Sequence, residues 1–232
     1  MREKGLIFNS EMVRAILDGR KTQTRRIMKL QPKPSKSRPG DFWFSSKKLE
    51  SMVHVSDLAP GNSPIADYHL FIQEHCCPFG AVGNRIWVRE AFRVHSRATD
   101  VATLVYKASE RNSWTEQTHR VPVAVCNKPA TPEKWTPSLH MPRWASRILL
   151  EITDVRVERL NAISEEDARA EGIIDGGCLN CGEPEPCGCA NPEPDATDAF
   201  AYLWQSIYGQ ENWNANPWVW VISFERVEGG AA

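Results

Sequence analysis

The sequence predicts an α+β protein: a small, partly closed mixed β-barrel with short helices at its rim and insertions between its strands. Segments with the two-residue alternation of β-strands outnumber segments with the period of a helix, and the helical segments are short. Of the 232 residues, 41% are apolar, which is enough for a hydrophobic core. We therefore expect a single domain over residues 1–232, with insertions at about 30–80 and 175–195.

Six segments have the composition or the alternation of β-strands. They are residues 4–8, 21–28, 83–94, 102–108, 147–160 and 216–227. Three segments have the pattern of short helices: residues 10–18, 164–173 and 198–209. The last strand candidate is apolar on both faces, so we expect it to lie buried in a sheet.

Small polar residues mark the starts of two of these helices. Ser10 is placed as the N-cap of the first helix, and Ser164 with Asp167 forms a start that resembles a capping box. Residues 29–48 are rich in Pro, Ser and Lys, so we expect a loop there. Residues 45–80 have no clear period and are interpreted as an insertion.

The near-neutral chain separates its charges along the sequence. Its formal net charge is −1, yet residues 1–40 hold eleven Lys and Arg against three acids, and residues 161–200 hold ten acids against one Arg. A basic arm often serves phosphate, but simple solvation explains it equally well. No apolar run approaches the roughly 20 residues needed to span a bilayer, and we find no signal-peptide pattern, so we expect a cytoplasmic protein.

Four stretches resemble a known family when taken in their order along the chain. They are "ILDGRKTQTRR", "GNRIWVREAF", "ISEEDARAEGI" and "PWVWVISFERV". Together they resemble the ASCH domain of the PUA-like superfamily, in particular the larger ASCH proteins encoded by phages and prophages. The resemblance covers most of the chain except about residues 30–80 and the Cys-rich loop. It implies a PUA-like fold and RNA binding.

The resemblance also implies a site. Some small bacterial members are amidohydrolases that remove the acetyl group from N(4)-acetylcytidine, and others have been proposed to be ribonucleases. In the amidohydrolases a Lys and a Thr of the G-x-K-T-x-T motif act with a Glu, and these correspond by motif position to Lys21, Thr24 and Glu171. The resemblance implies that the three converge at the barrel mouth, although three-residue spacing on a strand would place Lys21 and Thr24 on opposite sides.

Two mechanisms stay open for such a site. Thr24 could attack an amide carbonyl while Lys21 accepts its proton, provided that burial lowers the pKa of the Lys21 ammonium. In the other version Glu171 activates a water while Lys21 and Thr24 stabilise the oxyanion. A purely structural alternative is that Lys21 and Arg26 pair with carboxylates such as Glu90 or Glu171.

Four basic residues are candidates for contact with nucleic acid. Lys21, Arg25 and Arg26 lie in the most cationic stretch of the chain, "GRKTQTRR". Arg143 lies in "PSLHMPRWASRI", which mixes cations with an aromatic residue, as base-stacking and phosphate-binding segments do.

The Cys-rich loop has the spacing of a metal site. Its four thiols follow the pattern C-x2-C-x5-C-x-C at Cys178, Cys181, Cys187 and Cys189. Two thiolate pairs on Gly-rich turns can close a tetrahedral zinc site with no open position, so we expect a structural zinc. Disulfides and a reduced, metal-free loop are the alternatives.

Three classes of function fit the sequence. The first is a protein that binds RNA or a modified nucleoside in a basic pocket. The second is an amidohydrolase acting on an acylated cytidine-type nucleoside through Lys21, Thr24 and Glu171. The third is a phage interaction protein that uses the barrel as a scaffold. The sequence has no P-loop, no G-x-G-x-x-G and no G-x-S-x-G motif, so it does not support nucleotide-cofactor or hydrolase-elbow interpretations.

Overall fold

A computed structural model describes residues 2–59, 61, 68–174 and 196–227. The fold is mixed α+β, as the sequence predicted, and three sheets are present in these ranges. No helix in the described ranges is both long and apolar enough to cross a membrane.

The chain divides into two compact units, which are described separately. The first unit holds residues 1–19, 83–151 and 225–232, and the second holds residues 20–82 and 152–224. The single domain expected from the sequence stays a prediction.

The largest sheet has five strands. Their order is β1 (Glu3–Ile7), β6 (Arg85–Arg89), β10 (Leu149–Arg159), β11 (Trp218–Arg226) and β2 (Gln23–Ile27). Strands β1 and β6 are parallel, whereas β6 with β10 and β11 with β2 are antiparallel. In the part of the chain that the structure describes, β1 and β2 are end strands of an open sheet, so the predicted partly closed barrel is not confirmed.

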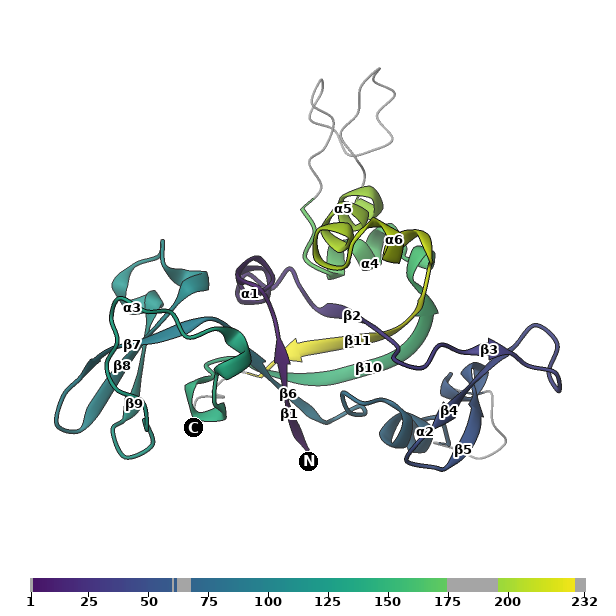
Figure 1. Cartoon of the computed structure of the whole chain (residues 1–232), viewed down its shortest axis with the longest axis horizontal. Coiled ribbons are helices and arrows are strands. Elements are labelled where there is room, and N and C mark those ends of the chain that lie inside the picture. Colours follow the sequence, from purple (N-terminus) through teal and green to yellow (C-terminus); the bar gives the residue numbers. More distant parts are fainter. Residues whose placement is uncertain (1, 60, 62–67, 175–195, 228–232) are drawn as a thin grey trace, which may run out of the picture. The chain divides into compact units, whose positions relative to one another are not determined.

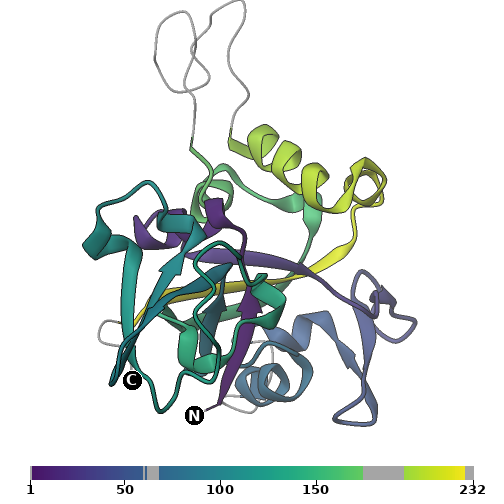
Figure 2. The same cartoon turned by 60° about the vertical axis from the view of Figure 1, so that its left-hand side comes forward.

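The first unit also contains an antiparallel meander of β7 (Phe92–Arg97), β8 (Val101–Tyr106) and β9 (Thr118–Pro122), which Figure 2 shows. Among its described residues, this unit has two α-helices, α1 (Ser10–Leu17) and α3 (Trp114–Gln117). Apolar residues of the meander, such as Phe92 and Leu104, pack with Met141 and Ala145 in one buried cluster. The predicted single strand over residues 83–94 is therefore wrong, because this segment holds all of β6 and the first residues of β7, which belong to different sheets.

In the second unit, three helices gather on one side of β2 and β11 (Figure 1). They are α4 (Glu165–Ala170), α5 (Ala196–Tyr208) and α6 (Gln210–Asn214). Phe200 and Trp204 of α5 pack with Val219 and Val221 of β11 in a buried cluster. Since strand side chains alternate, this packing assigns one face of the sheet to the helices.

The segment predicted as a loop contains strands instead. Strands β3 (Lys33–Pro34), β4 (Phe42–Ser46) and β5 (Ser51–His54) form a small antiparallel sheet, and α2 (Tyr68–Cys76) follows them. Phe42 and Phe44 of β4 lie against Trp218 and Trp220, with ring centroids 4.9 and 5.9 Å apart. These rings pack with the face of β11 opposite the helices, and such tertiary packing overrides a loop-like local composition.

The start of α1 differs by one residue from the sequence prediction. Asn9 is the N-cap, and its side-chain oxygen accepts a hydrogen bond of 2.8 Å from the backbone N–H of Met12. Ser10, the predicted cap, is the first residue of the helix. The second predicted cap is confirmed, because the Ser164 hydroxyl accepts from the backbone N–H of Asp167 at 3.1 Å.

Replacing Asn9 by Ala should lower the free energy of unfolding by about 1 kcal/mol, since a helical N–H loses its partner. Asn9→Asp should retain most of the stability, because aspartate also caps and suits the helix dipole. Chemical denaturation followed by circular dichroism measures both. A larger loss for Ser10→Ala than for Asn9→Ala would contradict the assignment of the cap.

Candidate functional site

Lys21 and Glu171 are brought together by the backbone of the second unit. Lys21 lies two residues before β2, and Glu171 is the C-cap of α4. The two residues form an isolated antiparallel β-bridge, and the N–H of Thr22 donates to the carbonyl of Ala170 at 2.8 Å. The pair therefore rests on main-chain pairing between segments 150 residues apart in the sequence.

The two side chains form a buried ion pair. The Lys21 Nζ donates to the Glu171 carbonyl at 2.8 Å and to the Glu171 Oε2 at 2.5 Å. The side chains are 0% and 3% exposed, respectively. Burial lowers the pKa of the Lys21 ammonium, and the Glu171 carboxylate offsets only part of that effect, so the pKa of Lys21 lies below its ordinary value. The structure therefore places Lys21 in a buried position and not at the open barrel mouth that the sequence predicted.

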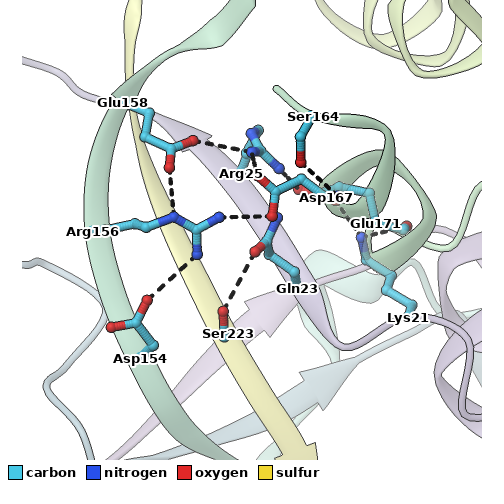
Figure 3. A network of polar contacts seen from close by, with 10 residues as sticks. All are labelled: Lys21, Gln23, Arg25, Asp154, Arg156, Glu158, Ser164, Asp167, Glu171 and Ser223. Atoms are coloured by element: carbon cyan, nitrogen blue, oxygen red, sulfur yellow. Dashed lines mark hydrogen bonds and ion pairs between the residues drawn. The ribbon is translucent and has the colours of Figure 1, made fainter. Parts of the chain in front are cut away.

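Arg25 lies in the same polar network (Figure 3). Its Nη2 donates to Glu158 Oε2 at 3.1 Å and to Asp167 Oδ2 at 2.9 Å, and its Nη1 is 3.7 Å from Glu171 Oε1. The Arg25 side chain is 0% exposed. Its charge is therefore balanced by buried or half-buried carboxylates, and in this conformation it cannot reach a phosphate in solution.

Arg156 of β10 contacts the same two carboxylates as Arg25, those of Glu158 and Asp167. Its Nε lies 2.5 Å from Glu158 Oε1, its Nη2 donates to Asp167 Oδ1 at 2.8 Å, and its Nη1 lies 3.4 Å from Asp154. Burial raises the pKa of Asp167, but Arg156 and Arg25 together lower it more, so the net pKa is below its ordinary value. Asp167 thus stabilises the fold above its unfolded-state pKa, and this contribution is lost as the pH falls through the folded-state pKa.

Sequence reasoning missed this network, although one signal for it exists. Asp154, Arg156 and Glu158 are spaced two apart on β10, so they share one face of the strand. A row of alternating charges on one strand face indicates partners of the opposite sign on neighbouring segments. Nothing in the local sequence identifies Arg25 and Asp167 as those partners, because they are 142 residues apart.

Thr24 does not belong to this network. Arg25 points toward Asp167 of α4, and Gln23 points toward Ser223 of β11 (Figure 3). Both side chains therefore lie on the helix-covered face of β2. Thr24 lies between them in an extended strand, so strand alternation places it on the opposite face, where it is 2% exposed. The structure therefore brings Lys21 and Glu171 together and leaves Thr24 on the other side of the strand.

Arg26 and Arg143 have different surroundings. Arg26 shares the Thr24 face of β2, is half-buried, and stands opposite Trp220 in the strand register. Arg143 belongs to the first unit, is 37% exposed, and its Nε donates to Glu3 Oε2 at 2.8 Å. That hydrogen bond lowers the pKa of the Glu3 carboxyl below its ordinary value.

The predicted zinc ligands lie outside the described residues. This holds for all four thiols, Cys178, Cys181, Cys187 and Cys189. Within the described ranges, no group of three or more His, Cys, Asp and Glu side chains is arranged to hold a metal ion. The zinc site stays a prediction.

Comparisons of this chain with protein-family models, with curated proteins and with solved structures found no significant match. The geometry of the chain's own residues therefore carries the functional argument.

Replacing Lys21 by Met should lower the free energy of unfolding by about 3–5 kcal/mol, because the buried Glu171 carboxylate loses its hydrogen-bonded partner and keeps only the 3.7 Å contact with Arg25. The double variant Lys21→Met/Glu171→Leu should recover most of this loss, since no uncompensated charge remains. Urea denaturation measures each variant. The exposed Lys36→Met is the matched control and should change stability by no more than about 0.5 kcal/mol. A Lys21→Met protein as stable as the wild type would contradict the buried pair.

Proposed function

We propose that this chain is an ASCH-type, PUA-like protein that binds RNA or a modified nucleoside. The observation that supports this most directly is the contact between Lys21 and Glu171, 150 residues apart. The family resemblance pairs these same two positions, and the contact does not follow from composition or periodicity. In this proposal the five-stranded sheet and its covering helices correspond to the curved sheet of a PUA-like barrel.

The geometry changes which residues would touch the RNA. Lys21 and Arg25 are buried in ion pairs, so we assign them to holding β2 against α4. Arg26 lies on the other face of β2, and the side chain of Arg143 is 37% exposed in the first unit. An arginine presents five N–H donors in a fork that suits phosphate, and only the Nε of Arg143 donates to Glu3. Arg26 and Arg143 are therefore the proposed RNA contacts, each within its own unit.

Binding to a single-stranded RNA of about 12 nucleotides should weaken as salt rises from about 50 to 200 mM, because each phosphate contact releases counterions. Arg26→Gln or Arg143→Gln should each reduce the slope of log K against log salt by about 0.7. Fluorescence anisotropy measures the affinity at each salt concentration. Arg111→Gln, at an exposed position of the first unit, is the control and should leave the slope unchanged. Absent or salt-independent binding would refute the RNA proposal.

A second candidate function is hydrolysis of an acylated cytidine-type nucleoside. Burial gives Lys21 a lowered pKa beside a carboxylate, a combination typical of proton-transfer sites. The position of Thr24 on the opposite face of β2 disfavours its attack with Lys21 as base. The version in which Glu171 activates a water is the better fit, with Lys21 alone stabilising the oxyanion, since Thr24 lies on the other face. It requires α4 or its neighbours to move, because the Lys21 and Glu171 side chains are both buried.

If the chain is such an enzyme, it should release acetate from N(4)-acetylcytidine, and Glu171→Gln should lower the rate at least about a hundredfold. Liquid chromatography of the nucleoside product gives the rate. Glu158→Gln, which alters the same network outside the Lys21 contact, should retain most of the activity. No turnover by the wild type would exclude this reaction. A protein that neither turns over the nucleoside nor binds RNA would fit the interaction-protein class.

A further inference from the structure

The second unit contains a cleft of about 510 Å³ that the sequence did not indicate. It lies beside the end of β2, the end of β4 and the C-terminal end of α2, so residues from the predicted 30–80 insertion form most of it. The lining residues are Ile27, Met28, Lys29, Leu30, Phe44, Ser45, Ser46, Lys47, Lys48, His75, Cys76, Pro78, Phe79 and Trp220. Its volume is in the range of small-molecule sites, about 300–1,000 Å³.

Aromatic side chains form part of the wall. Phe44 and Trp220 are buried and meet edge to face, with ring centroids 5.9 Å apart and an interplanar angle of 86°. Phe79 adds a third, half-buried ring to the lining. Rings held rigidly by packing offer flat apolar surfaces on which a planar group can stack at little entropic cost.

Three lysines lie among the lining residues, and all three are exposed: Lys29, Lys47 and Lys48. No carboxylate of a described residue forms an ion pair with any of them, and the lining includes no Asp or Glu. The Lys48 Nζ donates to the backbone carbonyl of Glu74 at 3.2 Å. Three like charges around one opening are mutually repulsive, so an anion that bound there would relieve that repulsion.

The thiol in the cleft adds no negative charge. Burial raises the pKa of Cys76 above its ordinary value, an effect that Ser46 and Lys48 offset only in part. Cys76 is therefore a neutral thiol near pH 7. With His75, Ser45 and Ser46 it supplies polar groups beside the aromatic wall.

We propose that this cleft binds a nucleotide, with the base against the rings of Phe44, Trp220 and Phe79 and the phosphate held by Lys47, Lys48 and Lys29. An aromatic group and an anion in one ligand match the two features that the cleft combines. The site is distinct from the buried Lys21–Glu171 pair, and it does not depend on the binding of RNA to Arg26 or Arg143.

Isothermal titration calorimetry with the four 5′-nucleoside monophosphates tests the proposal. At least one should bind, and the matching nucleoside and inorganic phosphate should each bind at least about tenfold more weakly, because each lacks half of the recognised chemistry. Lys47→Gln/Lys48→Gln should weaken the nucleotide at least about tenfold. The matched control is Lys33→Gln/Lys36→Gln, two exposed lysines of the same unit outside the cleft, and its affinity should equal that of the wild type.

A second measurement locates the ligand. Peptide mapping after alkylation should show that the nucleotide slows modification of Cys76 in the wild type and fails to do so in Lys47→Gln/Lys48→Gln. The proposal is overturned if no monophosphate binds at millimolar concentration, if nucleoside and nucleotide bind equally, or if the cleft and control variants weaken binding equally. Mononucleotide binding without RNA binding would support the cleft proposal and refute the RNA proposal. RNA binding without mononucleotide binding would refute the cleft proposal and support the RNA proposal.

Discussion

The ion pair between Lys21 and Glu171 is the interaction on which the rest of the second unit depends. A lone charge inside a protein is costly, so Lys21, Arg25 and their carboxylate partners must stay together for the segment before β2 and the end of α4 to remain buried. The pair is also fixed by main-chain bonds, because Lys21 and Glu171 form a β-bridge. Both constraints hold β2 against α4. The side chains on that face of β2 are therefore engaged in packing and ion pairs.

Because the helix-covered face of β2 is occupied by these contacts, a ligand would have to be recognised on the other face. Gln23 and Arg25 serve the helix-covered face, so the opposite face of β2 carries Thr24 and Arg26. On that side β4 packs its aromatic residues against β11. The cleft with the three exposed lysines lies at the ends of β2 and β4. A stretch with four cations, "GRKTQTRR", is therefore divided between two roles by the two-residue period of a strand.

The elements with strong periodicity were predictable, and those held by distant packing were not. The long strand β10, the buried strand β11 and helix α5 follow from alternation and from apolar spacing in the sequence. The small sheet was missed because Pro, Ser and Lys dominate residues 29–48, while Phe42 and Phe44 are stabilised by rings of Trp218 and Trp220 far along the chain. The N-cap of α1 was missed by one residue, since Asn9 and Ser10 are both good caps and only backbone geometry distinguishes them.

The sequence by itself determined the mixed α+β class and the positions of the strongly periodic elements, such as β10, β11 and α5, because these depend on local periodicity. It also indicated, through its resemblance to a family, that Lys21 and Glu171 belong together, and the structure has them in contact. Only the tertiary structure decided that this pair is buried and that Arg25 forms ion pairs with Glu158 and Asp167. It also decided that Thr24 lies on the face of β2 opposite these residues. The physical reason is that alternation tells which side chains share a face, whereas the segments that cover each face are chosen by packing and charge pairing between residues far apart in the chain.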